Sequence, residues 1–191
     1  VVVEAATKYI CGHSDISLGI AAASGAHGKA LRATMTNLGI CAGPDDLYAG
    51  LRGLRTMRLR LQQSSENGLY LADKLKAHPM VLDVLHPGLP TSPDHPIYER
   101  DFSGSCGLFA FILPNNLPQE ALDKAIEEMD IFAIGASWGG YESLIMGVTD
   151  LNSLRTATGW NQKGTLIRVH IGLENPDDLI QDLERSILPI Q

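Results

Sequence analysis

The sequence lacks the features that mark several large classes of protein. No apolar run in its 191 residues approaches the roughly 20 residues that a helix needs to cross a bilayer. Its three cysteines, Cys11, Cys41 and Cys106, are odd in number and have no Cys-x-x-Cys spacing, which predicts free thiols in a reducing compartment. The net charge of −7 argues against a nucleic-acid-binding surface, which needs a basic patch.

The composition that remains, 45% hydrophobic and 19% charged residues, is typical of a globular domain with its own core. Val1–Val3 is β-branched and predicts the end of a buried strand. Residues 1–43 otherwise hold few large side chains, which is typical of the tail of a larger domain. The start at Val1, inside an apparent strand, suggests truncation or processing.

A long helix is predicted to begin at Gly43-Pro44-Asp45-Asp46, because proline suits a first helical turn and aspartate complements the helix dipole. Its apolar residues recur at helical spacing as far as His78-Pro79. We place a domain boundary inside this helix near residue 53, which gives domains of residues 1–53 and 54–191.

The second domain is predicted to be α/β, with a small, mainly antiparallel sheet and helices on one side. A helix opens at Pro118 and another is capped by Asn175, with its apolar residues Leu179, Leu183 and Ile187 facing inward. The predicted strands are Val81–Leu85, Leu108–Leu113, Ile131–Gly135 and Leu166–Ile171.

Two groups of charged or ligating residues carry no specific chemistry. The arginines on the long helix (Arg52, Arg55, Arg58 and Arg60) are interpreted as a solvated or subunit-facing surface. The histidines among the prolines (His78, His86 and His95) lack a helical i, i+4 pair and cysteine partners, so no metal site is predicted.

Lys8 is the first candidate for chemistry, because it follows the predicted strand and precedes the small-residue run Gly12-His13-Ser14-Asp15. A desolvated amine can form a Schiff base with an aldehyde. The simpler interpretation is a lysine whose stem lies on apolar surface while its ammonium reaches water.

Arg168 is the second candidate. Within its strand, Leu166, Arg168 and His170 share one face, while Ile167, Val169 and Ile171 share the other. If the isoleucine and valine face is the core, Arg168 points outward or into a cleft, where its guanidinium suits a carboxylate. A surface ion pair is the alternative.

Three segments together resemble the pyridoxal-phosphate enzymes of cysteine and methionine metabolism. They are Ala5-Ala6-Thr7-Lys8-Tyr9 with Gly12-His13-Ser14-Asp15, then Ser137-Trp138-Gly139-Gly140-Tyr141-Glu142-Ser143-Leu144, then residues 164–174 around Arg168. Their order and spacing also match that family. The resemblance covers nearly the whole chain and corresponds to the C-terminal half of such an enzyme, in which residues 1–53 end a fold-type I cofactor-binding large domain.

The resemblance implies a role for each candidate residue. Lys8 holds pyridoxal 5'-phosphate as a Schiff base and removes the substrate Cα proton, and Thr7 donates its hydroxyl to the cofactor phosphate. Arg168 binds the substrate carboxylate, with the Trp138 backbone N–H beside it, and Ser137 steers the lysine amine. The other cofactor-binding groups of the family lie upstream of Val1.

The motif forms are most similar to the β-lyase branch, which cleaves cystathionine to homocysteine, pyruvate and ammonia in methionine biosynthesis. The Cγ–S-forming and Cγ–S-cleaving branches stay open. The resemblance further implies a cytoplasmic homotetramer built from dimers, and a 191-residue chain that is inactive alone. Ser64, where a histidine is expected, and Ala136, where a tyrosine is expected, put the substrate preference in doubt.

Two interpretations come from other classes. Gly135-Ala136-Ser137-Trp138-Gly139 satisfies the Gly-x-Ser-x-Gly pattern of serine hydrolases, with Asp150 and His170 in the order that an α/β-hydrolase requires. Alternatively, the chain is a non-catalytic assembly fragment.

Overall fold

The computed structural model describes residues 1–114, 116–152, 157–160 and 162–190. The chain divides into two compact units, residues 1–60 and 61–191. The division falls inside helix α2, which runs from Pro44 to Lys76. The boundary predicted near residue 53 lies in this same helix, and the functional assignment of the two parts remains a prediction.

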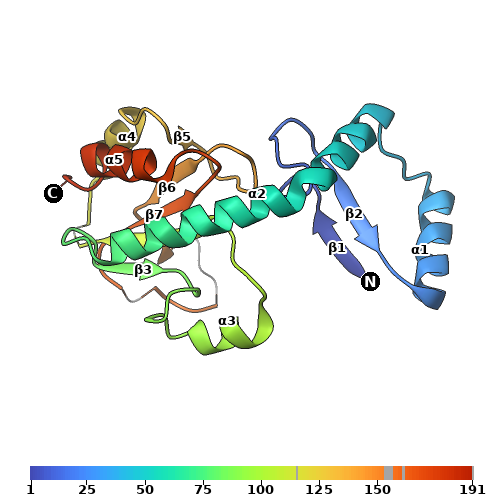
Figure 1. Ribbon diagram of the computed structural model, residues 1–191, viewed down its shortest axis with the longest axis horizontal. Coiled ribbons are helices and arrows are strands. Elements are labelled where there is room, and N and C mark those ends of the chain that lie inside the picture. The colour runs from blue at the N-terminus through green and yellow to red at the C-terminus, as the bar shows by residue number, and fades with distance from the viewer. Residues whose placement is uncertain (115, 153–156, 161, 191) are drawn as a thin grey trace. The chain divides into compact units, whose positions relative to one another are not determined.

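The first unit contains a two-stranded antiparallel sheet, in which β1 (Val2–Ala5) pairs with β2 (Gly19–Ala22) (Figure 1). Helix α1 (Gly25–Leu38) follows, and Gly39 ends it in the left-handed conformation at φ 66°. The prediction that Val1–Val3 is buried is wrong, because Val3 is 75% exposed. Among the described residues, no layer of helices covers this small sheet, so its alternating side chains all reach solvent.

Helix α2 begins at the predicted proline and carries Asp45 and Asp46 in its first turn, where their charge complements the helix dipole. Lys74 and Lys76 occupy its last turn and complement the opposite end of the dipole. The predicted long helix is therefore confirmed, and so is its end just before His78-Pro79. No helix among the described residues is long and apolar enough to cross a membrane.

The second unit is built on a five-stranded sheet in the order β3-β4-β7-β6-β5. Among the described strands of this sheet, only the β5–β6 pairing is parallel, so the expectation of a mainly antiparallel sheet is confirmed. The strands are β3 (Asp83–Leu85), β4 (Leu108–Leu113), β7 (Thr165–His170), β6 (Leu144–Val148) and β5 (Ala133–Ile134).

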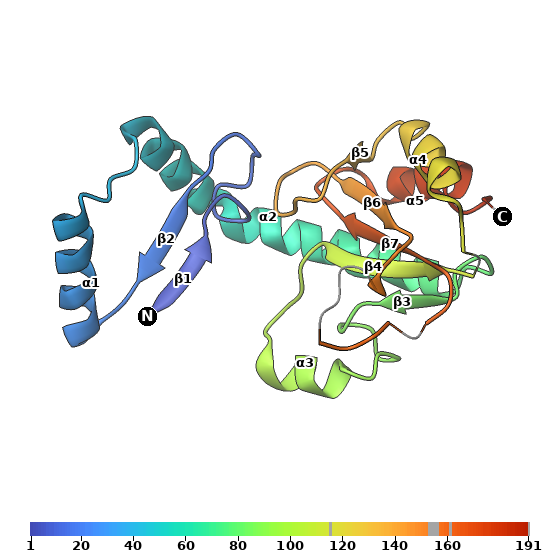
Figure 2. The same cartoon turned by 180° about the vertical axis from the view of Figure 1, so that it is seen from behind.

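Three helices cover one face of this sheet: the second half of α2, α4 (Gln119–Glu127) and α5 (Pro176–Ser186). In Figure 1 α2 passes in front of the strands, and Figure 2 shows the sheet from behind. Alternate residues of β7 and β4, such as Ile167, Val169 and Phe111, face the helices and are almost fully buried. Leu179, Leu183 and Ile187 of α5 are also fully buried, as predicted, and each contributes roughly 2 kcal/mol of apolar burial.

Several elements differ from the prediction. Strand β3 begins two residues later than expected, because Val81 N–H bonds back to the His78 carbonyl in a turn. The sequence interpretation missed two strands and two helices: β2, β6, α1 and α3 (His95–Asp101). Residues 153–156, which follow β6 closely, lie outside the described part of the chain.

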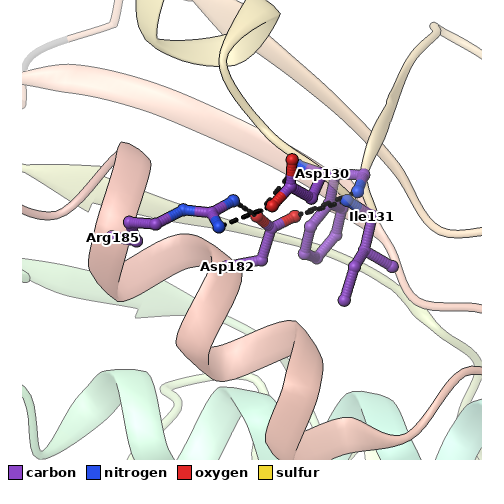
Figure 3. A network of polar contacts seen from close by, with 5 residues as sticks. Asp130, Ile131, Asp182 and Arg185 are labelled. Carbon is purple, nitrogen blue, oxygen red and sulfur yellow. Dashed lines mark hydrogen bonds and ion pairs between the residues drawn. The ribbon is translucent and has the colours of Figure 1, made fainter.

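Strand β5 is shorter than predicted because the N–H groups that precede it bind a side chain instead of a strand. The buried Asp182 carboxylate of α5 accepts hydrogen bonds from the backbone N–H groups of Asp130 (3.1 Å), Ile131 (2.9 Å) and Phe132 (3.2 Å), and Figure 3 shows this network. Arg185, one turn further along α5, donates to Asp182 at 2.6 Å and forms an exposed ion pair with Asp130. The carboxylate thus fixes the segment that leads into β5.

Candidate active site

Lys8 lies in a tight turn directly after β1, as the sequence predicts. Its N–H donates to the Ala5 carbonyl at 3.0 Å, and its own carbonyl accepts from Gly12 N–H at 2.7 Å. Cys11 N–H closes the turn onto Ala6 at 2.8 Å, and the side chains of Ala6 and Cys11 are buried beneath it. Burial raises the pKa of the Cys11 thiol above its ordinary value. The Lys8 side chain itself is half-buried.

Thr7 anchors this turn to the residue before β2. Its hydroxyl oxygen accepts from Leu18 N–H at 2.8 Å, and its N–H donates to the Leu18 carbonyl at 3.0 Å. The hydroxyl donates to the same carbonyl over a longer 3.3 Å. A phosphate would have to replace this weaker bond, so the role of Thr7 in cofactor binding remains a prediction.

Arg168 lies on the central strand β7, on the face of the sheet opposite the helices. It pairs in register with Ala110 of β4 and Met146 of β6. The sequence argument about the two faces is confirmed, because Ile167, Val169 and Ile171 are fully buried while Arg168 is half-buried. Burial lowers the pKa of Arg168 below its ordinary value. An arginine guanidinium stays charged at neutral pH.

The loop after β5 holds the guanidinium of Arg168. Its Nη1 donates to the Ala136 carbonyl at 3.0 Å, and its Nη2 reaches the Ser137 carbonyl at 3.5 Å. The Trp138 ring lies 5.6 Å from the guanidinium carbon, within cation–π range. The structure therefore brings together three residues predicted for substrate binding, Ser137, Trp138 and Arg168. Their individual roles remain predictions.

His170 is a structural residue of this loop. It is buried, and its Nε2 accepts from Gly139 N–H at 3.0 Å, where Gly139 turns the chain at φ 80°. Burial lowers the pKa of His170 and favours the neutral ring. A serine hydrolase would need this nitrogen as the base for Ser137. The geometry thus argues against the Ser137-Asp150-His170 interpretation.

Hydrogen bonds between Ser143, Gly172 and Glu174 form a clamp that joins this loop to the chain that follows β7. Ser143 N–H and hydroxyl each donate to the Glu174 carboxylate at 2.8 Å, and the Ser143 hydroxyl accepts from Gly172 N–H at 2.9 Å. A side chain at Gly172 would overlap the Tyr141 carbonyl, so only glycine allows the two segments to approach this closely.

Helix α2 supports the same segment from the other side. Asn67 Nδ2 donates to the carbonyls of Gly172 and Glu174, both at 3.1 Å. Ser64, which replaces the expected histidine, donates to the Ile171 carbonyl at 2.5 Å and packs against Gly107. A histidine would need more room here. The second departure, Ala136, is exposed beside the guanidinium of Arg168.

The three histidines among the prolines each make a local backbone contact, and His95 is the first residue of α3. Nδ1 of His78 accepts from Met80 N–H at 3.2 Å, Nδ1 of His86 accepts from Gly88 N–H at 2.9 Å, and His95 contacts the Pro87 carbonyl at 3.0 Å. Within the described ranges, no group of three or more potential ligands could hold a metal ion.

Comparison with known proteins gives a family whose model, described as Cys/Met metabolism PLP-dependent enzyme, matches residues 1–188. The chain belongs to this family. It is 43% identical to a cystathionine beta-lyase of Salmonella typhimurium over 183 residues, which cover 95% of this chain and 46% of that protein. It is also 33% identical to a cystathionine gamma-lyase of Sus scrofa over 192 residues, covering 95% and 46%.

Solved structures of the family share the fold. The crystal structure of a cystathionine gamma synthase from Xanthomonas oryzae pv. oryzae, in complex with aminoacrylate and cysteine, has a TM-score of 0.81 at 32% identity. The match covers 97% of this chain and 49% of that one. The predicted fold class, part of a fold-type I pyridoxal-phosphate enzyme, is confirmed. The chain spans about half the length of the curated relatives it matches.

Pyridoxal phosphate, on which this family depends, fits the residues of the Lys8 turn. The turn offers a primary amine on a half-buried side chain, with its backbone fixed by hydrogen bonds on both sides. The Thr7 hydroxyl next to it holds one long bond that a stronger acceptor can replace. Lys8 would therefore hold the cofactor, and Thr7 would meet its phosphate.

Sequence reasoning missed four residues that shape the Lys8 turn of the first unit or the Arg168 loop of the second: Arg60, Ser143, Glu174 and Asp182. Ser143 and Glu174 belong to the resembling segments but had no role assigned. Ser143 and Glu174 bind each other across 31 residues of sequence, and Asp182 binds backbone groups about 50 residues before it. No local sequence pattern reveals contacts over such separations. Arg60 is the exception, since Gly53, Thr56 and Arg60 share one helix face at three- and four-residue spacing.

Proposed function

We propose that the protein containing this chain is a pyridoxal-phosphate-dependent carbon–sulfur lyase that cleaves cystathionine, with water, to homocysteine, pyruvate and ammonia. The observation that carries the proposal is the guanidinium of Arg168, held from one side by the Ala136 carbonyl and the Trp138 ring. This arrangement suits two-point recognition of an amino acid carboxylate. Identity of 42–43% to three proteins named as cystathionine beta-lyases supports the β-elimination.

The chain's own residues would divide the work as follows. Lys8 would hold the cofactor and, once released, would take the proton from the substrate Cα at its Nζ. Arg168 would fix the carboxylate, and the clamped loop at Ser137-Trp138 would keep the guanidinium in place. When bound, pyridoxal phosphate supplies the electron sink for the carbanion that proton removal creates.

A second candidate is cleavage or formation of the Cγ–S bond. Ala136, an exposed small residue next to the guanidinium of Arg168, favours keeping it, because side-chain size at this point shapes the space beside the carboxylate site. The relatives at 33% identity named as gamma-lyases also support it.

Product analysis tests the proposal. The whole protein, loaded with pyridoxal phosphate, is incubated with cystathionine, and the keto acid and thiol are identified by mass spectrometry. Pyruvate with homocysteine supports the β-lyase, whereas 2-oxobutyrate with cysteine supports the γ-lyase. No product of either kind, with the cofactor bound, contradicts both and favours the assembly role.

Location and assembly are also proposals. We propose a cytoplasmic enzyme, in keeping with the free thiols of Cys11, Cys41 and Cys106, and a homotetramer built from dimers. Light scattering of the purified protein measures the assembly directly, and a monodisperse monomer would contradict it.

A further inference from the structure

Arg60 of helix α2 is bound to the turn that carries Lys8. Its Nη1 donates to the Tyr9 carbonyl at 2.9 Å and its Nη2 to the Ile10 carbonyl at 3.2 Å, so it holds the two residues that follow Lys8. The same Nη2 donates to the Gly53 carbonyl at 2.6 Å. Nε donates to the Thr56 hydroxyl at 3.1 Å, which fixes the side chain along its own helix.

We infer that Arg60 is a positioning residue that sets the direction in which the turn presents the Lys8 amine; this rests on the proposed function of Lys8. The two carbonyls define the peptide planes immediately after Lys8. On the other side of Lys8, its N–H is already fixed to Ala5. With both flanks held, the Cα–Cβ direction of Lys8 is determined by the backbone.

Two glycines make this contact possible. A side chain at Gly53 would overlap the carbonyl oxygens of Ile10 and Cys11, and one at Gly12 would overlap the guanidinium of Arg60. Glycine weakens a helix interior relative to alanine, and close approach of the Lys8 turn is a physical reason for Gly53 in α2. Gly12 also adopts φ 71°, which favours glycine.

The geometry requires a guanidinium. Three backbone carbonyls and a hydroxyl surround Arg60, and a planar fork of five donors reaches acceptors in several directions. An ammonium donates from a single point at the end of a flexible stem, so it cannot meet all four. Arg60 is half-buried, which strengthens hydrogen bonds made by its charge.

The test compares variants of the whole protein purified with pyridoxal phosphate. Arg60→Gln and Arg60→Lys are measured against Arg58→Gln, an exposed arginine on the same helix. The first measurement is hydrogen–deuterium exchange at Cys11 and Gly12, whose N–H groups close the turn. The second is the rate at which borohydride traps a cofactor adduct on Lys8, located by peptide mass spectrometry.

We expect Arg60→Gln to speed exchange and to slow trapping by about tenfold or more, the effect of losing one charge-assisted hydrogen bond. Arg60→Lys should stay closer to the glutamine variant than to the unchanged protein, and Arg58→Gln should behave as unchanged. Should Arg60→Gln fail to fold, Gly53→Ala displaces the turn directly and should slow trapping in the same way.

Two results would overturn the inference: trapping at the unchanged rate in Arg60→Gln, or full recovery by Arg60→Lys. The first of these results overturns the inference even if exchange becomes faster, since Arg60 would then support the fold without orienting Lys8. If the unchanged protein gives no adduct on Lys8, the proposed function itself fails, which is a separate outcome.

Discussion

The Lys8 turn and the Arg168 strand each depend on an arginine that donates to two consecutive backbone carbonyls, but the two guanidinium groups differ in what they have left to bind. Arg60 makes four hydrogen bonds of 2.6–3.2 Å, all to acceptors in its own unit. Arg168 makes one at 3.0 Å and two contacts at 3.5 Å, one of them to the Met146 sulfur. Contacts of 3.5 Å are long for hydrogen bonds.

This difference in hydrogen bonding suits Arg60 to positioning the backbone and Arg168 to binding a ligand. A guanidinium already supplied with near-ideal acceptors gains little from a carboxylate, whereas one held mainly by a single bond and an aromatic ring retains donors for a ligand. The supports differ as well. Arg168 lies on the central strand of a five-stranded sheet, while Lys8 follows a two-stranded one with exposed valines. The lysine turn therefore relies more on specific hydrogen bonds than on packing.

The strongest test of this comparison is Arg168→Lys. Loss of the planar fork should lower kcat/KM for cystathionine by about 100-fold, or about 2.7 kcal/mol, mainly through KM. Steady-state kinetics measures it, with Arg100→Lys, an exposed arginine on α3, as the control. A kcat/KM within about twofold of the unchanged protein would assign the carboxylate to another residue.

Asp182→Asn probes the support beneath the Arg168 loop. Both oxygens of the Asp182 carboxylate accept from backbone N–H groups, so the amide of asparagine turns a donor toward at least one of these N–H groups in either orientation. The free energy of unfolding should therefore fall by about 2 kcal/mol. Urea denaturation measures it. Asp178→Asn, at an exposed position on the same helix, should change it by less than about 0.5 kcal/mol. Equal effects of the two would mean that the Asp182 network contributes little.

Glu174→Gln tests the clamp between Ser143 and the chain after β7. Glutamine keeps one acceptor and loses the other, which should lower the free energy of unfolding by about 1 kcal/mol. It should also raise hydrogen–deuterium exchange in residues 137–143, with Glu184→Gln on the exposed face of α5 as the control. Unchanged exchange would show that the loop is held without this carboxylate.

The smallest expected effect is a pH dependence from His86 and His170. Burial lowers the pKa of both histidines below the ordinary 6.5. Below that pH, the unfolded chain therefore binds more protons than the folded chain. The free energy of unfolding should keep its full value above the ordinary histidine pKa. It should fall as the pH drops below that pKa, by at most about 1.4 kcal/mol per pH unit for each histidine. Urea midpoints at about pH 7.5 and about pH 5.5 measure it. If a His170→Gln variant has the same dependence of the free energy of unfolding on pH as the unchanged protein, His170 does not contribute to that dependence.

Local patterns predicted the elements whose packing is repetitive. The apolar residues of α5 and the two faces of β7 follow from spacing, because residues at the repeat of a helix or strand face the same environment, and the Asn175 cap follows from residue type. The three segments of family resemblance supplied Lys8, Ser137, Trp138 and Arg168. Strand boundaries were less accurate, as at β5, where Asp182 takes the N–H groups of residues 130–132.

The sequence pattern of α2 did not distinguish its exposed arginines from the one that binds the Lys8 turn. Arg52, Arg55 and Arg58 are exposed as predicted, but Arg60 is half-buried and fully engaged, so that part of the prediction is wrong. Its acceptors at Tyr9 and Ile10 lie about 50 residues away. The exposed Val1–Val3 also departs from prediction, since strand propensity specifies a backbone conformation and not what covers it.

We propose that Lys8 carries the cofactor. The most direct test of this proposal is borohydride reduction of the whole protein with pyridoxal phosphate, followed by peptide mass spectrometry. The account predicts a reduced cofactor adduct on the peptide that contains Lys8, and its loss in Lys8→Ala but not in Lys29→Ala. An adduct on another lysine, or none at all, would contradict it.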